Sequence, residues 1–316
     1  MSAGAPLHGQ AAIDFLAAGA ADGDPRASAH WREMHRDFRY ENGEFHGLRG
    51  FGGYSPAPAW PRRAAHRILQ RPFRRLGDGL SRFAEADRAT AEIVRRQGRA
   101  YDLDALRQAL TAALLLERAP ERLGPRRIAA VIGDGFCALG SLLLSLAPGL
   151  RIVSVNLSRT LLVDMVFLAK ALPGVKFALA TDAQGLKTLL ADPGVRAIAL
   201  RAEDSGLLAE CPLDLAANVV SMQEMDPPVI AGYFAALRAS EGPPLAFYCC
   251  NRLEKTLPDG TVVRFRDYPW SARDEILLDE PCPWSQTFYT WRPPIYRKYD
   301  GPIWHRLALL EKAYAA

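Results

Sequence analysis

The spacing of apolar residues changes about two-fifths of the way along the chain. From Arg127 onward, short apolar runs rich in β-branched residues alternate with longer segments whose apolar residues recur at helical spacing. The pattern predicts strands over residues 128–132, 151–155, 175–180, 195–200, 213–220 and 245–250, and helices over 139–146, 158–172 and 229–237. Such alternation predicts an α/β fold with a mostly parallel, doubly wound sheet, covered by helices on both faces.

In the first part of the chain, before Arg127, apolar residues recur mainly at helical spacing. Short helices are expected over residues 11–21 and 29–40, and a longer one begins after Asp102, a suitable N-cap, with leucines at helical spacing. We therefore predict a helical N-terminal region over residues 1–122, with a lid, substrate-binding or oligomerisation role, and a sheet domain over residues 123–316. A glycine-rich aromatic segment, residues 42–54, is either a connector or a lid that orders over a substrate.

The last 60 residues have a third pattern. Residues 261–265 alternate like an antiparallel strand, and the apolar spacing of Trp304, Leu307 and Leu310 allows a closing helix. Between them, aromatic residues and prolines are dense, which favours pocket walls over regular core.

A glycine turn carries the first chemical signal. Gly133 and Gly135 follow the strand at 128–132 and precede a helix, so backbone N–H groups are exposed at the carboxyl edge of the sheet, where open α/β folds bind nucleotide-like ligands. With Ala138, they fit the loose form of the dinucleotide fingerprint. The acid expected about 20 residues later is replaced by Asn156, an amide that still bonds a ribose hydroxyl without marking one nucleotide. We favour a nucleotide-type site over a turn that serves packing alone.

Composition narrows the class of protein. A hydrophobic fraction of 49%, 23% charged residues and a net charge of +4 are ordinary for a globular protein. No uninterrupted apolar run reaches the length of a membrane span, and the first ten residues lack the pattern of a secretory signal. The five cysteines lack C-x-x-C spacing, which favours reduced thiols and a cytoplasmic location. Adjacent Cys249 and Cys250 are expected on opposite faces of a strand.

Arginine is dense between Arg62 and Arg99. One interpretation is a nucleic-acid or phosphate-binding face. The other, which we favour, is a solvated helical surface, because acids return after Arg75 and few aromatic residues are interspersed. The apolar residues expected to face inward are Ile68, Leu69, Leu76, Leu80, Phe83, Ile93 and Val94.

Linked motifs in the second half resemble the sugar O-methyltransferase family. They are Asn218-Val219-Val220-Ser221-Met222-Gln223-Glu224-Met225, Phe247-Tyr248-Cys249-Cys250-Asn251-Arg252-Leu253-Glu254-Lys255, Leu257-Pro258-Asp259-Gly260, Asp267-Tyr268-Pro269-Trp270, Tyr299-Asp300-Gly301-Pro302 and His305-Arg306-Leu307. The resemblance covers roughly residues 125–310. It implies a Rossmann-like fold that uses S-adenosylmethionine, releases S-adenosylhomocysteine and has an antiparallel strand completing the sheet. Val131 stands where the usual methyltransferase turn has an acid, and Cys137 where it has a third glycine, so we expect Asp134 to take over a cofactor contact.

Methyl transfer requires donor and acceptor atoms held in line, and a hydroxyl acceptor benefits from a general base. The residues expected to bind the cofactor are Gly133, Asp134, Gly135, Asn156, Ser158, Asp182, Asn218 and Ser221, with Thr181 and Glu203 as weaker choices for the adenine side. Glu224 is the leading candidate for the base, His305 the second and Asp267 a third. The residues expected to bind the acceptor are Gln223, Asn251, Arg252, Trp270 and Trp284.

Each of these residues also has an ordinary structural interpretation. Glu224 is also an acid of the kind favoured at a helix N-terminus, and His305 could be a hydrogen-bonded histidine in the terminal segment. Arg252 could form an ion pair with a nearby acid. Trp270 and Trp284 are equally compatible with buried packing. No acids have diagnostic ligand spacing and no His/Cys cluster exists in the sequence, so we predict no metal.

The favoured function is therefore S-adenosylmethionine-dependent methylation of a hydroxyl on a sugar or other small polyhydroxylated natural product. A homodimer is the oligomer that we consider for this enzyme, and we expect no membrane partner. One alternative is an NAD(P)-dependent oxidoreductase, which rests on the loose glycine fingerprint alone and lacks a Tyr-x-x-x-Lys pair. The other, which we do not favour, is a noncatalytic protein that binds nucleic acid or anions through the Arg62–Arg99 face.

Overall fold

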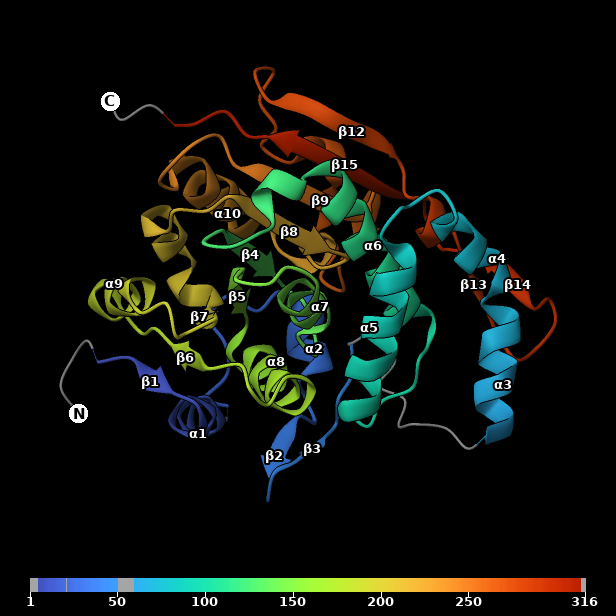
Figure 1. Cartoon of the computed structure of the whole chain (residues 1–316), viewed down its shortest axis with the longest axis horizontal. Helices are drawn as coiled ribbons and strands as arrows, with labels where there is room; N and C mark the ends of the chain where they lie inside the picture. The colour runs from blue at the N-terminus through green and yellow to red at the C-terminus, as the bar shows by residue number, and fades with distance from the viewer. Residues whose placement is uncertain (1–4, 21, 51–59, 314–316) are drawn as a thin grey trace.

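A nine-stranded sheet forms the centre of the computed structural model, which describes residues 5–20, 22–50 and 60–313. Its strand order is β1-β6-β7-β5-β4-β8-β9-β15-β12 (Figure 1). The strands are β1 (Leu7–His8), β4 (Ile128–Ile132), β5 (Arg151–Asn156), β6 (Phe177–Leu179), β7 (Ala197–Arg201), β8 (Leu215–Val219), β9 (Ala246–Arg252), β12 (Glu275–Pro281) and β15 (Ile303–Leu309).

The six strands from β6 to β9 are parallel, as the alternating pattern predicts. The outer strands β1, β15 and β12 are antiparallel to their neighbours. The predicted fold class is thus confirmed: a Rossmann-like, mostly parallel sheet with antiparallel strands near the C-terminus. The closing helix expected around Trp304 is wrong, because that segment is β15 and lies between β9 and β12.

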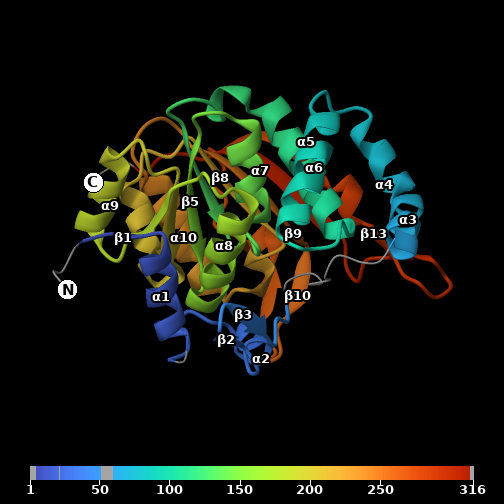
Figure 2. The same ribbon diagram turned by 60° about the horizontal axis from the view of Figure 1, so that its bottom comes forward.

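Helices cover both faces of the sheet (Figures 1 and 2). Ala129 and Val131 of β4 pack in one apolar cluster with α1 (Gln10–Gly19), α5 (Phe83–Arg96), α6 (Leu103–Arg118), α7 (Ala138–Leu146) and α8 (Ser158–Ala171). Ile128, Ala130 and Ile132 face the other cluster, with α9 (Ala183–Ala191), the 3₁₀ segment η3 (Ala202–Glu210) and α10 (Pro227–Ala239). Cys250 belongs to the first cluster and Cys249 to the second, so their expected opposite orientation is confirmed.

The N-terminal region is largely helical but contains a hairpin that the sequence did not predict. The helix expected over residues 29–40 ends early, as α2 (Ala29–Met34). The strands β2 (Arg39–Glu41) and β3 (Glu44–His46) follow and pair across Asn42 and Gly43, both with positive φ. Residues 42–50 of the proposed lid therefore belong to this hairpin and the segment after it, whereas 51–54 lie outside the described residues.

The arginine-rich segment is mostly helical surface. Arg74 pairs with Asp87, Arg82 with Glu85, and Arg95 and Arg96 with Glu92. Ile93 and Val94 of α5 are buried as expected. The expectation that Ile68 and Leu76 face inward is wrong, because these residues are 55% and 40% exposed. Ile68 lies in α3 (Trp60–Leu69), which stands with α4 (Arg71–Arg74) at the rim of the molecule beside the hairpin of β13 (Thr287–Tyr289) and β14 (Tyr296–Lys298) (Figure 1). Leu76 lies in the 3₁₀ segment η1 (Arg75–Gly77), which follows α4.

The predicted strand at 261–265 exists as β11 (Val262–Arg264), but it pairs with β10 (Glu254–Thr256) in a hairpin outside the central sheet. In the part of the chain that the structure describes, no helix combines the length and apolarity that crossing a bilayer requires.

Candidate functional site

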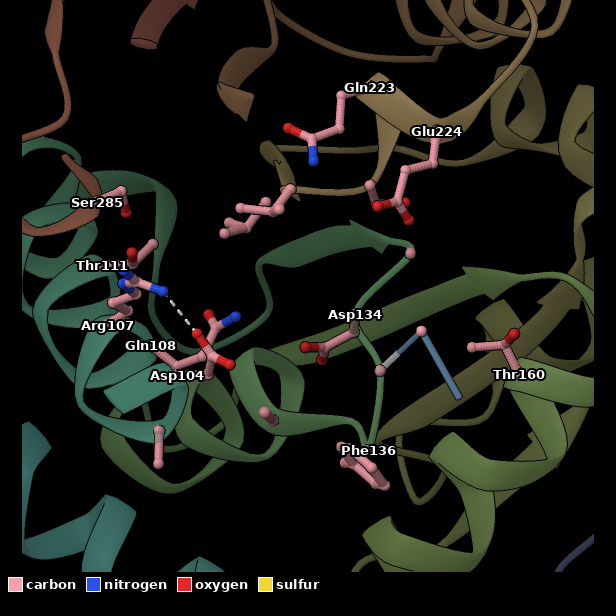
Figure 3. A pocket seen from close by; sticks show the side chains of 18 of the residues that line it. Asp104, Arg107, Gln108, Thr111, Asp134, Phe136, Thr160, Gln223, Glu224 and Ser285 are labelled. Atoms are coloured by element: carbon pink, nitrogen blue, oxygen red, sulfur yellow. Dashed lines mark hydrogen bonds and ion pairs between the residues drawn. The ribbon is translucent and has the colours of Figure 1, made fainter. Parts of the chain in front are cut away.

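A cavity of about 320 Å³ lies at the carboxyl ends of β4 and β8. The chain goes from β4 to β5 on one side and later returns to β8 on the other, so the strand order reverses at this point. Crevices at such switch points are where open α/β sheets bind ligands, and the volume is within the range of small-molecule sites. Figure 3 shows the cavity with the glycine turn at its base, α6 along one wall and Gln223 and Glu224 opposite.

The glycine turn after β4 is held in a conformation that favours glycine. Gly133 and Gly135 have φ of 67° and 69°, in the left-handed region. A Cβ at Gly133 would lie 1.8 Å from the Oγ of Ser221, which follows β8. The turn therefore brings the backbone after β4 into close contact with the Ser221 side chain after β8, at the floor of the cavity.

Asp134, inside this turn, caps α7 and borders the cavity. Its carboxylate accepts hydrogen bonds from the backbone N–H groups of Leu139 and Gly140, at 2.8 and 2.7 Å. Burial raises the pKa of Asp134 to about 6, although these backbone hydrogen bonds act to lower it. The amides that a phosphate would use at this helix N-terminus are already bonded to a carboxylate, so the turn presents negative charge to a ligand.

A second carboxylate supports the turn from below. Asp164 of α8 accepts hydrogen bonds from the backbone N–H of Cys137 and from Nδ2 of Asn156, both at 2.9 Å. Burial and the nearby charge of Asp134 raise the pKa of Asp164 to about 8. Asn156, expected to bond a ribose, lines the cavity while its side chain also bonds Asp164 and the backbone N–H of Leu157.

Glu224 lies opposite the turn, at the end of the 3₁₀ segment η4 (Met222–Glu224), within a cluster of charged side chains. Its Oε1 is 2.6 Å from Nζ of Lys255 on β10, and its Oε2 is 3.5 Å from Nε2 of His30 on α2. Burial lowers the pKa of His30, which favours the neutral imidazole. The hydroxyl of Ser28 donates to the carbonyl of Glu224 at 2.5 Å and so holds the start of α2 against η4.

A buried amide network positions η4. Nδ2 of Asn218 donates to the carbonyl of Ile132, and its Oδ1 accepts from the backbone N–H of Met222 and from Nδ2 of Asn251. Oδ1 of Asn251 accepts from the backbone N–H of Gln223. Because Asn218 and Asn251 are fully buried, they connect β4, β8 and β9 beneath the cavity without lining it.

The wall formed by α6 is polar. Asp104, Arg107, Gln108 and Thr111 face the cavity from successive turns of the helix (Figure 3). Arg107 bonds Asp104 at 2.8 Å and the carbonyls of Trp284 and Thr287, which fixes this wall against the C-terminal segment. The cavity thus has hydrogen-bonding groups on two sides.

Nine of the residues selected from the sequence come together here. Gly133, Asp134, Gly135, Asn156, Ser221, Gln223, Glu224, Arg252 and Trp284 all line the cavity.

The other selected residues lie elsewhere. The backbone N–H of Ser158 donates to Asp24, Asp182 caps α9 through the N–H of Gly185, and Glu203 pairs with Arg201. None of these, nor Thr181, lines the cavity.

The two remaining candidates for the base are also outside it. His305 is buried, with Nδ1 3.1 Å from the hydroxyl of Tyr248, and Asp267 has a side chain that is 70% exposed. Trp270 packs on Phe234 and Phe247 and donates its indole N–H to the carbonyl of Phe265, so packing explains its position.

Sequence reasoning did not select His30, Lys255, Arg99 or the polar face of α6. Lys255 stands in one of the motifs that carry the family resemblance, which is a signal that could have selected it. His30 has no such signal, because only the folded chain brings α2 next to η4. In the described part of the chain, no three His, Cys, Asp or Glu side chains gather as a metal site would require.

No protein-family model matches the chain, and a sequence search of curated proteins finds no match. Solved structures resemble its fold. One, from work on the conversion of a disulfide bond into a thioacetal group in echinomycin biosynthesis, is 12% identical, with a TM-score of 0.38, and the match covers 63% of this chain and 80% of the other.

Two more are named as methyltransferases. A TehB-like SAM-dependent methyltransferase from Corynebacterium glutamicum is 14% identical over 63% of this chain and 86% of its own, with a TM-score of 0.39. An O-methyltransferase family 2 protein from Planctomyces limnophilus, in complex with apigenin, is 13% identical over 59% of this chain and 51% of its own, with a TM-score of 0.37. At these values the likeness concerns the arrangement of strands and helices.

Proposed function

We propose that the protein is an S-adenosylmethionine-dependent methyltransferase that methylates a hydroxyl of a sugar or another small polyhydroxylated molecule. The observation that carries this proposal is the carboxylate of Asp134 at the floor of the cavity, bonded to the first free amides of α7. A dinucleotide places its pyrophosphate at those amides, where it would meet the Asp134 charge. A cofactor with a sulfonium and an ammonium group is attracted by the same charge.

The residues present fit such a cofactor. Gly133 packs against Ser221, and Gly135 lines the cavity without a side chain, so an adenosyl group can approach the backbone of the turn, with Ser221 and Asn156 supplying polar atoms. When bound, the cofactor supplies an electrophilic methyl group on a positively charged sulfur. The chain's contribution is to hold the acceptor oxygen in line with that methyl group and to exclude water.

Glu224 and His30 form the group that we assign to proton removal. As the acceptor oxygen forms its bond to the methyl carbon, the carbon–sulfur bond breaks and the hydroxyl proton passes to this pair. Lys255 holds one carboxylate oxygen of Glu224 and leaves the other facing His30. A neutral imidazole next to a carboxylate is well suited to accept a proton, because the carboxylate stabilises the imidazolium that forms.

Calorimetric titration with S-adenosylhomocysteine and with NAD tests the cofactor assignment. We expect S-adenosylhomocysteine to bind and NAD not to bind, and Asp134→Asn to weaken S-adenosylhomocysteine binding by about tenfold, since one charge interaction is lost. Binding of NAD in preference to S-adenosylhomocysteine would reject the proposal in favour of an oxidoreductase.

Transfer of a labelled methyl group into a panel of hydroxylated metabolites tests the base. We expect Glu224→Gln and His30→Gln to keep S-adenosylhomocysteine affinity and to lower turnover by about 100-fold or more, the usual contribution of general base catalysis. Glu44→Gln, an exposed substitution on β3 that does not line the cavity, is the matched control. Unchanged turnover in both active-site variants would remove the pair from the mechanism.

A further inference from the structure

We infer that the acceptor carries an anionic group, a carboxylate or a phosphate, which Arg252 binds in the cavity. This inference deepens the proposed function and rests on it, because the anion belongs to the molecule that is methylated. It starts from the charges around the cavity and from the hydrogen bonds that each of them makes.

Most of the arginines and lysines that line the cavity are already engaged by other groups. Lys255 contacts Glu224 at 2.6 Å, and Arg107 contacts Asp104 at 2.8 Å. Arg99 lies over the ring of Phe136 and donates to Oε1 of Gln97 at 3.1 Å. Arg252 is the remaining arginine or lysine among the described side chains that line the cavity.

The environment of Arg252 leaves its charge available. Its ion pair is with Asp300, at 3.5 Å, and the Asp300 side chain is 99% exposed, so water screens the interaction. The Nε of Arg252 is buried and has no hydrogen-bond partner among the described residues. A buried guanidinium N–H without a partner is costly, and a ligand oxygen would remove that cost.

The same side chain is fixed in place, as a binding residue should be. The guanidinium lies 5.0 Å from the centre of the Tyr299 ring, and the backbone N–H of Arg252 donates to Oε1 of Gln223 at 2.8 Å. An arginine held against an aromatic ring is pre-organised for the paired hydrogen bonds that carboxylates and phosphates accept. A positively charged cofactor in the cavity would add to the attraction for an anionic acceptor.

On the α6 wall of the cavity, Gln108 offers the complementary group. Its Oε1 is buried without a partner among the described residues, and the side chain lines the cavity from α6 (Figure 3). A carbonyl oxygen accepts hydrogen bonds from hydroxyl or N–H groups. The two side chains together therefore select an acceptor that carries both an anion and a hydrogen-bond donor.

The test measures binding of matched probes to the full chain loaded with S-adenosylhomocysteine, by ligand-observed NMR. Glucuronate and glucose 6-phosphate are compared with glucose, and benzoate and phenyl phosphate with benzyl alcohol. We expect at least one anionic probe to bind about tenfold more tightly than its neutral partner, the effect of one charge-assisted hydrogen bond. The carboxylate and phosphate arms then identify which anion the site takes.

Arg252→Gln should abolish this preference, and Arg252→Lys should keep part of it. The control is Arg264→Gln, which makes the same change in net charge on β11, away from the cavity. Equal binding of anionic and neutral probes, no binding of any anionic probe, or a preference that survives Arg252→Gln would overturn the inference.

Titration of the same samples with S-adenosylhomocysteine separates the two proposals. If S-adenosylhomocysteine binds and the anion preference is absent, the methyltransferase proposal stands and the anionic acceptor is rejected. If S-adenosylhomocysteine does not bind, the proposed function fails, and an anion preference that depends on Arg252 would still support an anion site in this cavity.

Discussion

Two buried carboxylates under the glycine turn give the site an unusual response to pH. Asp134 and Asp164 interact electrostatically, and burial raises the pKa of both, to about 6 and about 8. Asp164 still accepts two hydrogen bonds, from the backbone N–H of Cys137 and from the side chain of Asn156. The pair can therefore hold a proton near neutral pH, which limits the negative charge beneath the turn.

This arrangement predicts how stability depends on pH. A carboxyl group whose pKa is raised in the folded state stabilises the fold as long as it stays protonated. For Asp164 this stabilisation is fully present below the unfolded pKa, near 3.9, and is lost as the pH rises through the folded pKa, about 8. The free energy of unfolding of the wild type, relative to that of Asp164→Asn, should fall between pH 5 and 8 and then level off. Urea unfolding at each pH unit from 5 to 9 measures the difference. The control is Asp300→Asn, at a fully exposed side chain, for which the free energy of unfolding plotted against pH should run parallel to that of the wild type. A parallel plot for Asp164→Asn as well would contradict the prediction.

At the scale of elements, the contact between the β4 turn and the segment after β8 forms the floor of the site. Gly133 has φ of 67°, and a Cβ there would meet Ser221 Oγ at 1.8 Å. Gly133→Ala should abolish S-adenosylhomocysteine binding and lower the free energy of unfolding by about 1–3 kcal/mol, the cost of a strained backbone position. Calorimetry and urea unfolding measure the two effects.

The matched control for this substitution is Gly174→Ala, at an exposed turn where an added Cβ meets no heavy atom within 4 Å. The double variant Gly133→Ala/Ser221→Gly removes the clash but keeps the left-handed φ, so it should recover part of the lost stability. Normal cofactor binding by Gly133→Ala alone would show that the turn is not the cofactor site.

The same elements show how much the sequence could predict. β4, β5, β8 and β9 were predictable because each is a short apolar run rich in strand-forming residues, buried on both faces. β15 was not, because Trp304, Leu307 and Leu310 have a spacing that also fits a helix, and only pairing with β9 and β12 decides between the two.

The candidate site, like the strands, was predictable from the sequence only in part. The glycine turn and Glu224 follow strands directly, so the carboxyl edge of the sheet brings them together. His30 and the polar face of α6 come from the N-terminal region, and no local pattern indicates that they reach the cavity.

At the scale of the whole molecule, the C-terminal segment is attached to the sheet domain by a buried ion pair. Arg238 of α10 binds Asp274 through two contacts of 2.7 and 2.8 Å, and the Asp274 side chain is fully buried. Asp274 also accepts the backbone N–H groups of Glu311 and Ser271. One carboxylate thus connects α10 to the segments on both sides of the β12–β15 pair.

Asp274→Ala should therefore destabilise the whole fold rather than the surface alone. It leaves Arg238 partly buried without its partner and two backbone N–H groups without an acceptor, and breaking a buried pair in this way costs about 3–5 kcal/mol. Hydrogen bonds from Arg238, Glu311 and Ser271 also lower the pKa of Asp274 against the opposing effect of burial. The stability that Asp274 contributes is therefore present above its unfolded pKa and is lost as the pH falls through the lower folded pKa.

The measurement for Asp274→Ala is the urea midpoint of unfolding at pH 7. Glu92→Ala, which removes two exposed ion pairs on α5, should leave that midpoint almost unchanged, because exposed pairs are screened by water. Equal shifts in the two variants would mean that burial does not distinguish these ion pairs, and that strand pairing alone, of β12 with β15 and of β15 with β9, holds this segment.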